Sequence, residues 1–300
     1  MVAWFGPVAY LELHRGPTHS LLLLPFWAWV FSWVLAKILR DPGGWRALYG
    51  VTVMGIALHI AGDLITSYGT MIFWPLSDMR PGIGTTFIID LWFSGIILAG
   101  LLASMLFRKT RIPSVAASII LCAYVGFQYV QKQHAIEFAR EYAQRSGLAG
   151  EVTAQPRPVS PFNWTVFVSD ERLHRIAHIN LVREEPRSYK PGDGFVARLD
   201  SAYQPPGLAQ WETRSRYGER DVALEAWQSP ALAFFRWFAE LPALEASDAD
   251  GRCHWFVDLR FGSPGRDVMP FRFGACRENP PEGSPWRAYE RDGEARVPLR

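Results

Sequence analysis

The chain has 300 residues, with 31 lysines and arginines against 29 aspartates and glutamates, so its formal net charge is only +2 at pH 7. This balance lacks the basic excess of a nucleic-acid-binding protein, and we expect no nucleic-acid partner. Three cysteines are too few for a disulfide-rich scaffold.

The even composition is an average of two unlike halves. Residues 1–130 contain 8 Lys/Arg and 5 Asp/Glu, whereas the remaining residues contain 23 and 24. A change of this size predicts a domain boundary. We expect a transmembrane metal-site domain in residues 1–131, a helical extension and linker in 132–160, and a soluble domain in 161–300. The predicted fold class is a membrane α-helical bundle of about four transmembrane helices, followed by an α+β domain with an antiparallel sheet.

Two histidines precede the first apolar segment, in the run H-R-G-P-T-H-S at residues 14–20. Gly16 and Pro17 predict a turn after His14, and His19 is expected in the first turn of the helix that follows. Imidazole at such a position could bind a metal ion. The alternative is a pair of interfacial histidines without a common partner.

Four stretches are apolar and about long enough to cross a bilayer, so the lipid bilayer is the first expected partner. They are residues 20–39, 47–66, 88–107 and 113–130. Basic residues gather in the loop after the first stretch and in the loop after the third, which predicts that these loops are cytoplasmic. They are Lys37, Arg40, Arg46, Arg108, Lys109 and Arg111. The soluble domain is then predicted on the periplasmic face of a bacterial inner membrane.

The second apolar stretch carries two ionisable residues, His59 and Asp63. Such residues are costly inside a membrane and are therefore candidates for a function. Their spacing of four places them on one helix face, where an imidazole and a carboxylate can bind one metal ion. The alternative is a His–Asp hydrogen bond that holds two helices together.

Asp90 begins the third apolar stretch, where it could act as a base, orient a substrate, or simply stabilise the helix N-terminus. The predicted topology brings the outer ends of the first three stretches to one face of the membrane. We therefore predict a divalent metal site there, held by His14, His19, His59 and Asp63. Zinc suits this donor set best, with manganese or magnesium as alternatives.

These motifs resemble the YdjM-like family of bacterial inner-membrane metal-dependent hydrolases. The resemblance rests on H-R-G-P-T-H-S, on H-x-x-x-D-x-x-T-x-Y-G-T at 59–70, on P-L-S-D at 75–78 and on I-D-L at 89–91. In the second half it extends to S-P-F-N-W at 160–164, F-R-W-F-A-E-L-P at 235–242 and V-D-L-R-F-G at 257–262. The family is thought to be distantly similar to zinc-dependent phospholipases C and single-strand nucleases. The resemblance implies a phosphoester substrate and the same four ligand candidates.

One departure from the family pattern concerns the start of the chain. Family members usually begin with a further helix that carries an Asp-x-x-Thr-His start and a Pro-Asp-x-Asp motif, and this sequence contains neither. We expect either a start codon placed too late or the loss of part of the metal shell. The ligands that remain are enough for one metal ion.

The second half alternates apolar and polar residues as strands do, at 162–168, 173–182, 253–261 and 270–276. A helix is predicted over 230–240, and residues 147–161 are predicted to be a linker. Cys253 and Cys276 are expected to be unpaired thiols, with a disulfide as the alternative outside the cytoplasm. His174 and His178 are expected at the surface of one strand, and Trp164, Trp237 and Trp255 in the core.

Together these features predict a metal-dependent hydrolase at the outer membrane face, acting on a small-molecule or lipid phosphoester. Arg15 would clamp a substrate oxyanion and Asp90 would act as a base or orient the substrate. The rival hypothesis is a non-catalytic membrane protein whose outer domain binds envelope partners of unknown identity.

Overall fold

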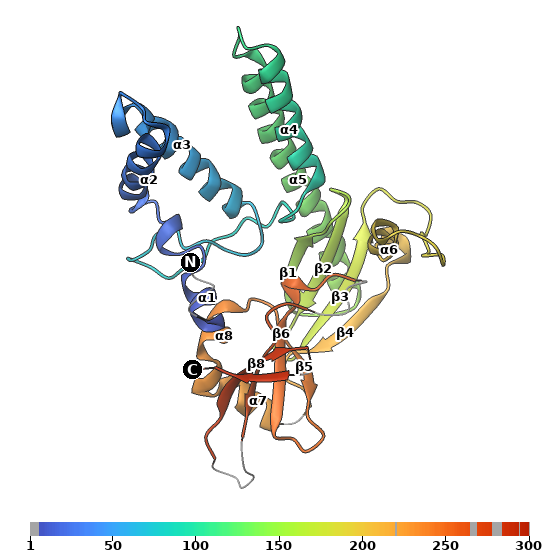
Figure 1. Cartoon of the computed structure of the whole chain (residues 1–300). Helices are drawn as coiled ribbons and strands as arrows, with labels where there is room; N and C mark the ends of the chain where they lie inside the picture. Colours follow the sequence, from blue (N-terminus) through green and yellow to red (C-terminus); the bar gives the residue numbers. More distant parts are fainter. Residues whose placement is uncertain (1–5, 220, 265–268, 278–283, 294, 300) are drawn as a thin grey trace. The chain divides into compact units, whose positions relative to one another are not determined.

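The computed structural model describes residues 6–219, 221–264, 269–277, 284–293 and 295–299. The chain forms two compact units, Met1–Gly84 and Thr85–Arg300. The order of the elements along the chain can be followed in Figure 1.

The first unit consists of helices and a long loop. Its elements are α1 (Pro7–Leu13), the 3-10 turn η2 (Pro17–His19), α2 (Leu24–Leu39) and α3 (Gly44–Leu64). Helix α2 buries a stripe of small side chains spaced four residues apart, Ala28, Ser32 and Ala36. Because small residues let a neighbouring backbone approach closely, this stripe accounts for the packing of α2 on α3.

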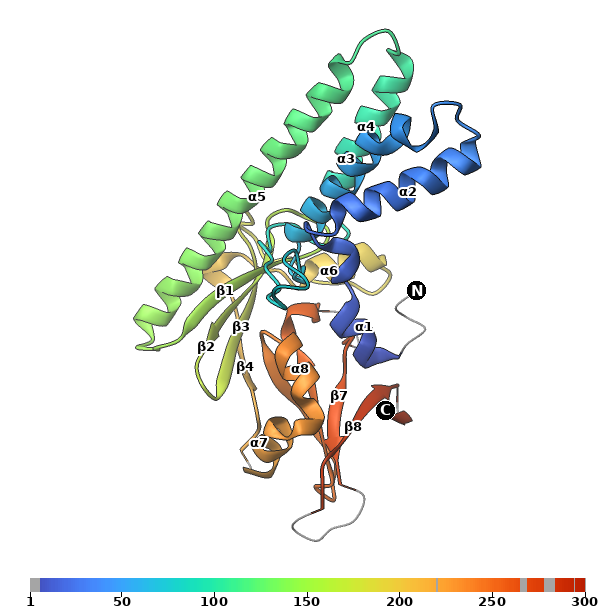
Figure 2. The same ribbon diagram turned by 90° about the vertical axis from the view of Figure 1, so that its left-hand side faces the viewer.

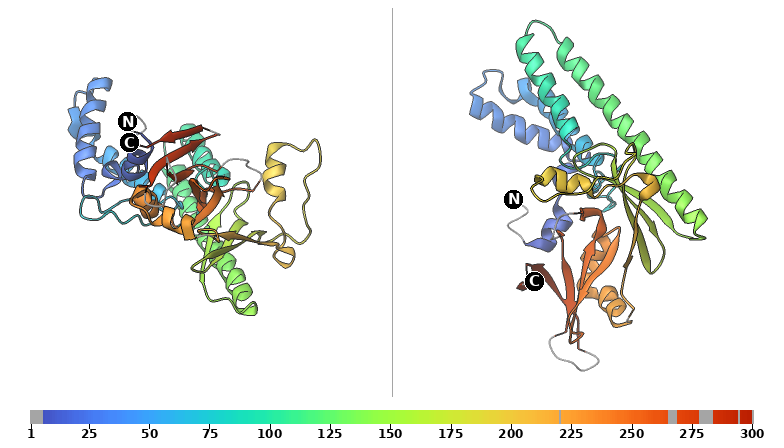
Figure 3. Two further views of the ribbon diagram at one scale, coloured as in Figure 1. Left: turned by 90° about the horizontal axis from the view of Figure 1, so that it is seen from below. Right: turned by 90° about the vertical axis from the view of Figure 1, so that its right-hand side faces the viewer.

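The second unit begins with a helix pair, α4 (Leu91–Leu106) and α5 (Ile112–Arg145). A Cβ on Gly100 of α4 would lie 2.4 Å from the Cβ of Ala117 on α5, so glycine is required at this crossing. The charged residues after 131 continue α5 without a break, as predicted. Figures 2 and 3 show α5 running on from its apolar part to the four-stranded sheet.

Two helices among the described residues, α3 and α5, are long and apolar enough to cross a membrane. A third candidate is the pair formed by residues 7–19 and 24–39, which is bent by 83° and would be a broken span or a re-entrant loop. Helix α4 has only 16 residues, fewer than the roughly 20 that a bilayer needs. All four predicted apolar helices are present, but only two or three of them meet the length criterion.

The rest of the second unit contains two antiparallel sheets, which confirms the predicted α+β class with two sheets instead of one. Sheet A has the order β1-β2-β3-β4 and sheet B the order β5-β6-β7-β8-β9. Sheet A consists of β1 (Glu151–Pro156), β2 (Asn163–Ser169), β3 (Leu173–Asn180) and β4 (Trp211–Ser215). Sheet B consists of β5 (Pro242–Ser247), β6 (Cys253–Asp258), β7 (Phe273–Cys276), β8 (Arg287–Asp292) and β9 (Ala295–Pro298). The connecting helices are α6 (Phe195–Ser201), η3 (Pro206–Leu208), α7 (Asp221–Gln228), η4 (Pro230–Leu232), α8 (Ala233–Phe238) and η5 (Leu259–Phe261).

Strand β2 is buried along its whole length because it is covered on both faces. Alternate residues of a strand point to opposite faces. Accordingly, Trp164 and Val166 pack with the alanines of α5 at 135, 139 and 143. Phe167, on the other face, packs with Leu241, which directly precedes β5, and with Val257 of β6. Of the three predicted core tryptophans, Trp164 and Trp255 are fully buried, whereas Trp237 is only partly buried.

The predicted linker at 147–161 is wrong in part, because it contains strand β1. Strand β1 lies at the edge of sheet A, where a proline at 156 costs little, since an edge strand needs only half of its backbone donors for pairing. The predicted helix over 230–240 is present as η4 followed by α8, and it ends at Phe238.

The prediction of unpaired thiols at Cys253 and Cys276 is also wrong. The two cysteines lie directly opposite each other on β6 and β7 and form a disulfide. Both are buried, at 2 % and 4 % exposure. Only the pairing register of the two strands brings them together, and the sequence does not reveal it.

The predicted surface position of His174 and His178 is wrong, because β3 is an interior strand of sheet A. The side chain of His174 is fully buried, with its ring nitrogens 2.7 Å from Ser169 Oγ and 2.8 Å from the carbonyl oxygen of Pro242. His178 is half-buried and its Nδ1 lies 2.8 Å from Thr165 Oγ1. Burial lowers the pKa of His178 to about 3, and the charge of Arg157 adds to this shift.

Candidate metal centre

The break between α1 and α2 positions the first half of the candidate centre. Helix α1 ends at His14, Arg15 adopts a left-handed backbone with φ of 57°, and Gly16 leads into η2. A Cβ on Gly16 would lie 2.8 Å from Met71 Cε and 3.0 Å from the carbonyl oxygen of Leu13, so only glycine fits here. The predicted turn is confirmed, but His19 lies in η2 and not in the first turn of α2.

Helix α3 supplies the second half. His59 and Asp63 lie one turn apart near its C-terminal end, and the chain leaves the helix after Leu64. Because they are four residues apart in a helix, the two residues share one helix face, as predicted.

Three side chains from these two places converge. Asp63 Oδ2 lies 3.0 Å from His19 Nε2 and 3.9 Å from His59 Nε2, and the two Nε2 atoms lie 3.0 Å apart. The side chains of His19 and Asp63 are 12 % and 15 % exposed, whereas that of His59 is 64 % exposed. The group is therefore anchored on one side and open on the other.

The spacing of the three donor atoms fits a tetrahedral metal ion. Zinc binds nitrogen and oxygen ligands at about 2.0–2.2 Å, which places neighbouring ligand atoms about 3.3 Å apart. The observed separations of 3.0, 3.0 and 3.9 Å bracket that value. Two imidazole nitrogens and one carboxylate oxygen are also donors that suit zinc.

Arg15 and Thr18 hold two of the three side chains in place. Arg15 Nε lies 3.2 Å from Asp63 Oδ2, and its Nη1 donates to the hydroxyl of Thr66 at 2.8 Å. The Arg15 side chain is only 5 % exposed, and its guanidinium lies over the ring of Tyr68. Thr18 Oγ1 lies 2.9 Å from His19 Nδ1. If Nδ1 carries the proton, Nε2 keeps a free lone pair on the side of Asp63.

Comparisons with known proteins find a family match over the segment that contains these residues. Residues 3–135 match the family described as YdjM inner membrane protein. The chain is 38 % identical over 73 residues to the inner membrane proteins YdjM of Escherichia coli (strain K12) and of Shigella flexneri. These matches cover 23 % of this chain and 34 % of each relative.

The chain is YdjM-like over residues 3–135.

It spans about a third of the length of the curated relatives that it matches. A weaker relative is the uncharacterized protein YfhP of Bacillus subtilis (strain 168), which is 24 % identical over 122 residues, or 41 % of this chain and 36 % of that protein. No solved structure matches the chain. The family assignment confirms the resemblance seen in the sequence, and it includes the segment that carries the candidate centre.

His14 is the one predicted ligand that lies apart from the three converging donors of this YdjM-like protein. Its ring stacks on Tyr10 at a centroid distance of 4.6 Å and meets the ring of Tyr68 edge-on at 5.2 Å. The left-handed turn at Arg15 is the reason, because it separates the direction of His14 from that of His19. His14 thus belongs to an aromatic cluster beside the centre.

Asp90 belongs to the second unit and has its own partners there. Its carboxylate accepts a hydrogen bond from the backbone nitrogen of Phe93 at 2.8 Å, so it caps α4. It also accepts from the hydroxyl of Tyr124 and from Gln128 Nε2, both on α5. These contacts support the alternative of a helix-capping charge, and its role as a base stays a prediction.

Two supporting residues, Thr18 and Thr66, have no role in the centre that the sequence alone reveals. Their contacts with His19 and Arg15 depend on the turn at 14–20 lying against the end of α3. The sequence signal that could have found them is the clustering of threonines beside both His motifs.

Proposed function

We propose that this YdjM-like protein is a membrane-bound metal-dependent hydrolase whose metal ligands are His19, His59 and Asp63. The observation that carries the proposal is the convergence of three donor atoms, one from each side chain, within 4.8 Å of one another. Catalytic zinc sites use three protein ligands and leave a further position open, whereas structural sites use four. Zinc is the proposed ion, with manganese or magnesium as alternatives.

A bound divalent ion would polarise a phosphoryl oxygen and make water nucleophilic near neutral pH. Arg15 acts as a positioning residue in this proposal, because its contacts with Asp63 and Thr66 fix the carboxylate. Thr18 orients the ring of His19 through Nδ1. The predicted second role of Arg15, as a clamp for a substrate oxyanion, stays a prediction.

The proposed substrate is a phosphoester, either a small molecule or a lipid-like one. Two features support it. His59 and Asp63 lie in the last turns of a helix that is long and apolar enough to cross a membrane, which supports a site near a membrane surface. The exposed ring of His59 gives a ligand accessible from outside the helix pair.

We further propose that the soluble domain lies on the periplasmic side of the inner membrane. Lys37, Arg40 and Arg46 flank the α2–α3 turn, and Arg108, Lys109 and Arg111 flank the α4–α5 turn, which is typical of cytoplasmic loops. The disulfide between Cys253 and Cys276 is typical of an oxidising compartment such as the periplasm.

Thiol labelling tests the orientation. In a Cys122→Ser background, Ala249→Cys should react with a membrane-impermeant thiol reagent in intact spheroplasts, and Thr110→Cys should react only after lysis. Both positions are exposed, so neither should be limited by burial. The reverse pattern would place the soluble domain in the cytoplasm.

A second candidate function is a non-catalytic membrane protein in which the same residues join helices. The ion pair between Arg15 and Asp63 favours it, because the carboxylate already has a cationic partner without a metal ion. The direct contacts of His19 with Asp63 and His59 could likewise serve as interhelical hydrogen bonds.

An assay with a chromogenic phosphodiester and with a short-chain phospholipid distinguishes the hydrolase from the non-catalytic candidate. The purified protein with added zinc or manganese should hydrolyse one of them slowly, and a chelator should abolish the hydrolysis. Asp63→Asn should remove the activity, and the control His134→Ala, an exposed histidine of α5, should retain it. Absence of hydrolysis by a protein with bound metal would favour the non-catalytic candidate.

A further inference from the structure

Exposed apolar side chains gather on the chain between β3 and the end of α6, residues 181–201, here called the β3–α6 segment. Seven large apolar side chains are strongly exposed among the described residues from 151 onward, and four of them lie between 182 and 196. They are Val182, Tyr189, Phe195 and Val196, with exposures of 59, 47, 65 and 55 %. Such a concentration in a water-soluble region indicates an interaction surface.

The β3–α6 segment leaves sheet A at the end that meets the apolar part of α5. Phe162, at the start of β2, packs edge-on against Phe127 of α5 at a centroid distance of 5.6 Å. The backbone nitrogen of Leu181 donates to the carbonyl oxygen of Phe162 at 3.0 Å, so the β3–α6 segment starts next to Phe162. Phe127 lies within the last turns of the apolar stretch 113–130. This end of sheet A therefore lies where α5 emerges from the bilayer.

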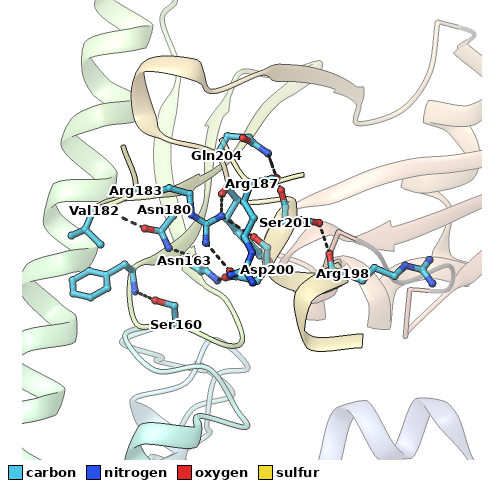
Figure 4. A network of polar contacts seen from close by, with 12 residues as sticks. Ser160, Asn163, Asn180, Val182, Arg183, Arg187, Arg198, Asp200, Ser201 and Gln204 are labelled. Atoms are coloured by element: carbon cyan, nitrogen blue, oxygen red, sulfur yellow. Dashed lines mark hydrogen bonds and ion pairs between the residues drawn. The ribbon is translucent and has the colours of Figure 1, made fainter. Parts of the chain in front are cut away.

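A buried carboxylate ties the returning part of the segment to this end of the sheet. Asp200, which is 4 % exposed, accepts from Asn163 Nδ2 at 2.8 Å and from Arg183 and Arg187 at 2.7 Å each. Figure 4 shows these side chains converging on Asp200. Asn180 also donates to Asn163, which links the end of β3 into the same network. The segment is thus anchored at both ends.

The anchored end of α6 is buried and its beginning is not. Leu199 and Asp200 are buried, whereas Phe195 and Val196 of the first turn are exposed. The hydrogen bonds of Asp200 therefore hold α6 at this end of sheet A, with the apolar side chains of its first turn exposed. Among described residues, no contact within the chain covers these two side chains enough to bury them.

The charges of the segment balance, so they do not favour an electrostatic partner. Four basic residues, Arg183, Arg187, Lys190 and Arg198, accompany four acidic ones, Glu184, Glu185, Asp193 and Asp200. A surface of this kind is suited to apolar contact, and tyrosine and phenylalanine are typical of membrane–water interfaces.

We propose that the β3–α6 segment docks on the bilayer surface from which α5 emerges. Tyr189, Phe195 and Val196 then enter the head-group region, to a depth of about 5–10 Å as interfacial helices do. This contact would fix the orientation of the soluble domain relative to the membrane. The proposal rests on the membrane location of the protein and does not depend on its proposed activity.

Quenching by lipids tests the docking. The full-length protein with Cys122→Ser would carry a single polarity-sensitive fluorophore at Tyr189→Cys or Val196→Cys, since the native disulfide is buried and does not react. It would be reconstituted in phosphatidylcholine vesicles that contain lipids with a nitroxide near the head group. The matched controls are Val222→Cys and Val297→Cys, at apolar positions that are also exposed, at 40 and 43 %.

We expect a blue-shifted emission and a loss of fluorescence on addition of nitroxide lipid for the labels at 189 and 196, and neither effect for the two controls. The loss should persist when salt is raised and should not require phosphatidylglycerol, because the contact is apolar. Equal quenching at all four positions, or none at 189 and 196, would overturn the proposal. Absence of quenching, with the labels shielded from water, would indicate a protein partner instead. Quenching that needs phosphatidylglycerol would contradict the apolar contact.

Discussion

Two regions of this YdjM-like protein hold an aspartate against an arginine, and they do so in opposite ways. In the soluble domain, Asp258 and Arg260 are both fully buried, and Asp258 also accepts hydrogen bonds from the backbone nitrogens of Arg260 and Glu240. In the candidate metal centre, Asp63 meets Arg15 on one side and two imidazole rings on the other. One of those rings, that of His59, is 64 % exposed.

The difference separates a structural ion pair from a candidate binding site. Among the described residues, Asp258 contacts hydrogen-bond donors of the chain itself, and its side chain is fully buried. Around Asp63 two imidazole nitrogens approach the same carboxylate oxygen at ligand-like distances, and one side stays open. Burial is therefore a poor guide to function here, whereas the convergence of atoms with lone pairs is a good one.

The largest expected effect is the loss of bound metal from the centre. Purified in mild detergent without a chelator, the protein should contain close to one equivalent of a divalent transition metal, measured by elemental analysis. Asp63→Ala and His19→Ala should lose nearly all of it, because each removes one of three ligands. His14→Ala should retain the metal, since His14 lies in the aromatic cluster, and His134→Ala is the exposed control. Full retention in Asp63→Ala would reduce the cluster to a helix-packing device.

The buried ion pair of the soluble domain gives the next largest effect. Asp258→Ala should lower the free energy of unfolding by about 3–5 kcal/mol, because it removes the buried carboxylate beside the buried guanidinium of Arg260, which then keeps only the 60 % exposed Glu240 among the ion pairs described for it. The matched control is Asp250→Ala, which breaks the exposed pair with Arg252 at the same spacing of two residues and should change the free energy of unfolding little. Urea unfolding followed by tryptophan fluorescence measures both, and equal effects would contradict the distinction between the pairs.

The disulfide should contribute somewhat less to the free energy of unfolding than the buried ion pair does. Cys253 and Cys276 are separated by 23 residues in sequence, and closing a loop of this length stabilises a domain by about 3 kcal/mol through the unfolded chain. The double substitution of both cysteines by alanine should shift the urea midpoint downward by the corresponding amount. Cys122→Ala, which removes an exposed thiol outside the sheets, should leave it unchanged.

Thr18 offers a finer test of the centre. Thr18→Ala removes the oxygen that lies 2.9 Å from His19 Nδ1 while leaving all three ligands in place. Loss of such an orienting partner typically weakens metal binding by about 10–100-fold. Competition with a chelator of known affinity measures the change. Thr18→Ser, which restores the hydroxyl, should recover the affinity, and a failure to do so would argue against orientation as the cause.

The smallest expected effect is a pH dependence in the soluble domain. The folded-state pKa of His178 is lowered to about 3 by burial and by Arg157, below the ordinary value of 6.5. The unfolded chain therefore takes up a proton as the pH falls below 6.5, and the folded protein does not until about pH 3. Stability is fully present above pH 6.5 and should fall by about 2 kcal/mol between pH 7 and pH 5. His178→Gln should reduce this slope in urea titrations, and an unchanged slope would assign it to other groups, such as the buried His174.

The sequence by itself determined the features that depend on local chemistry. Apolar stretches became helices because a run of apolar residues without strand alternation is typical of a membrane helix, and His59 and Asp63 shared a face because four residues make about one helical turn. The turn at Gly16 and the helix-capping position of Asp90 likewise depend on neighbouring residues in the sequence.

Tertiary structure decided everything that depends on which distant segments meet. It brought His19 to Asp63 and left His14 on Tyr10, because the left-handed residue Arg15 lies between the two histidines. It paired Cys253 with Cys276 through strand register, and it buried His174 by covering sheet A on both faces. Local residue preferences carry no information about register or about what packs on the far side of a strand, since these follow from contacts between residues far apart in the chain.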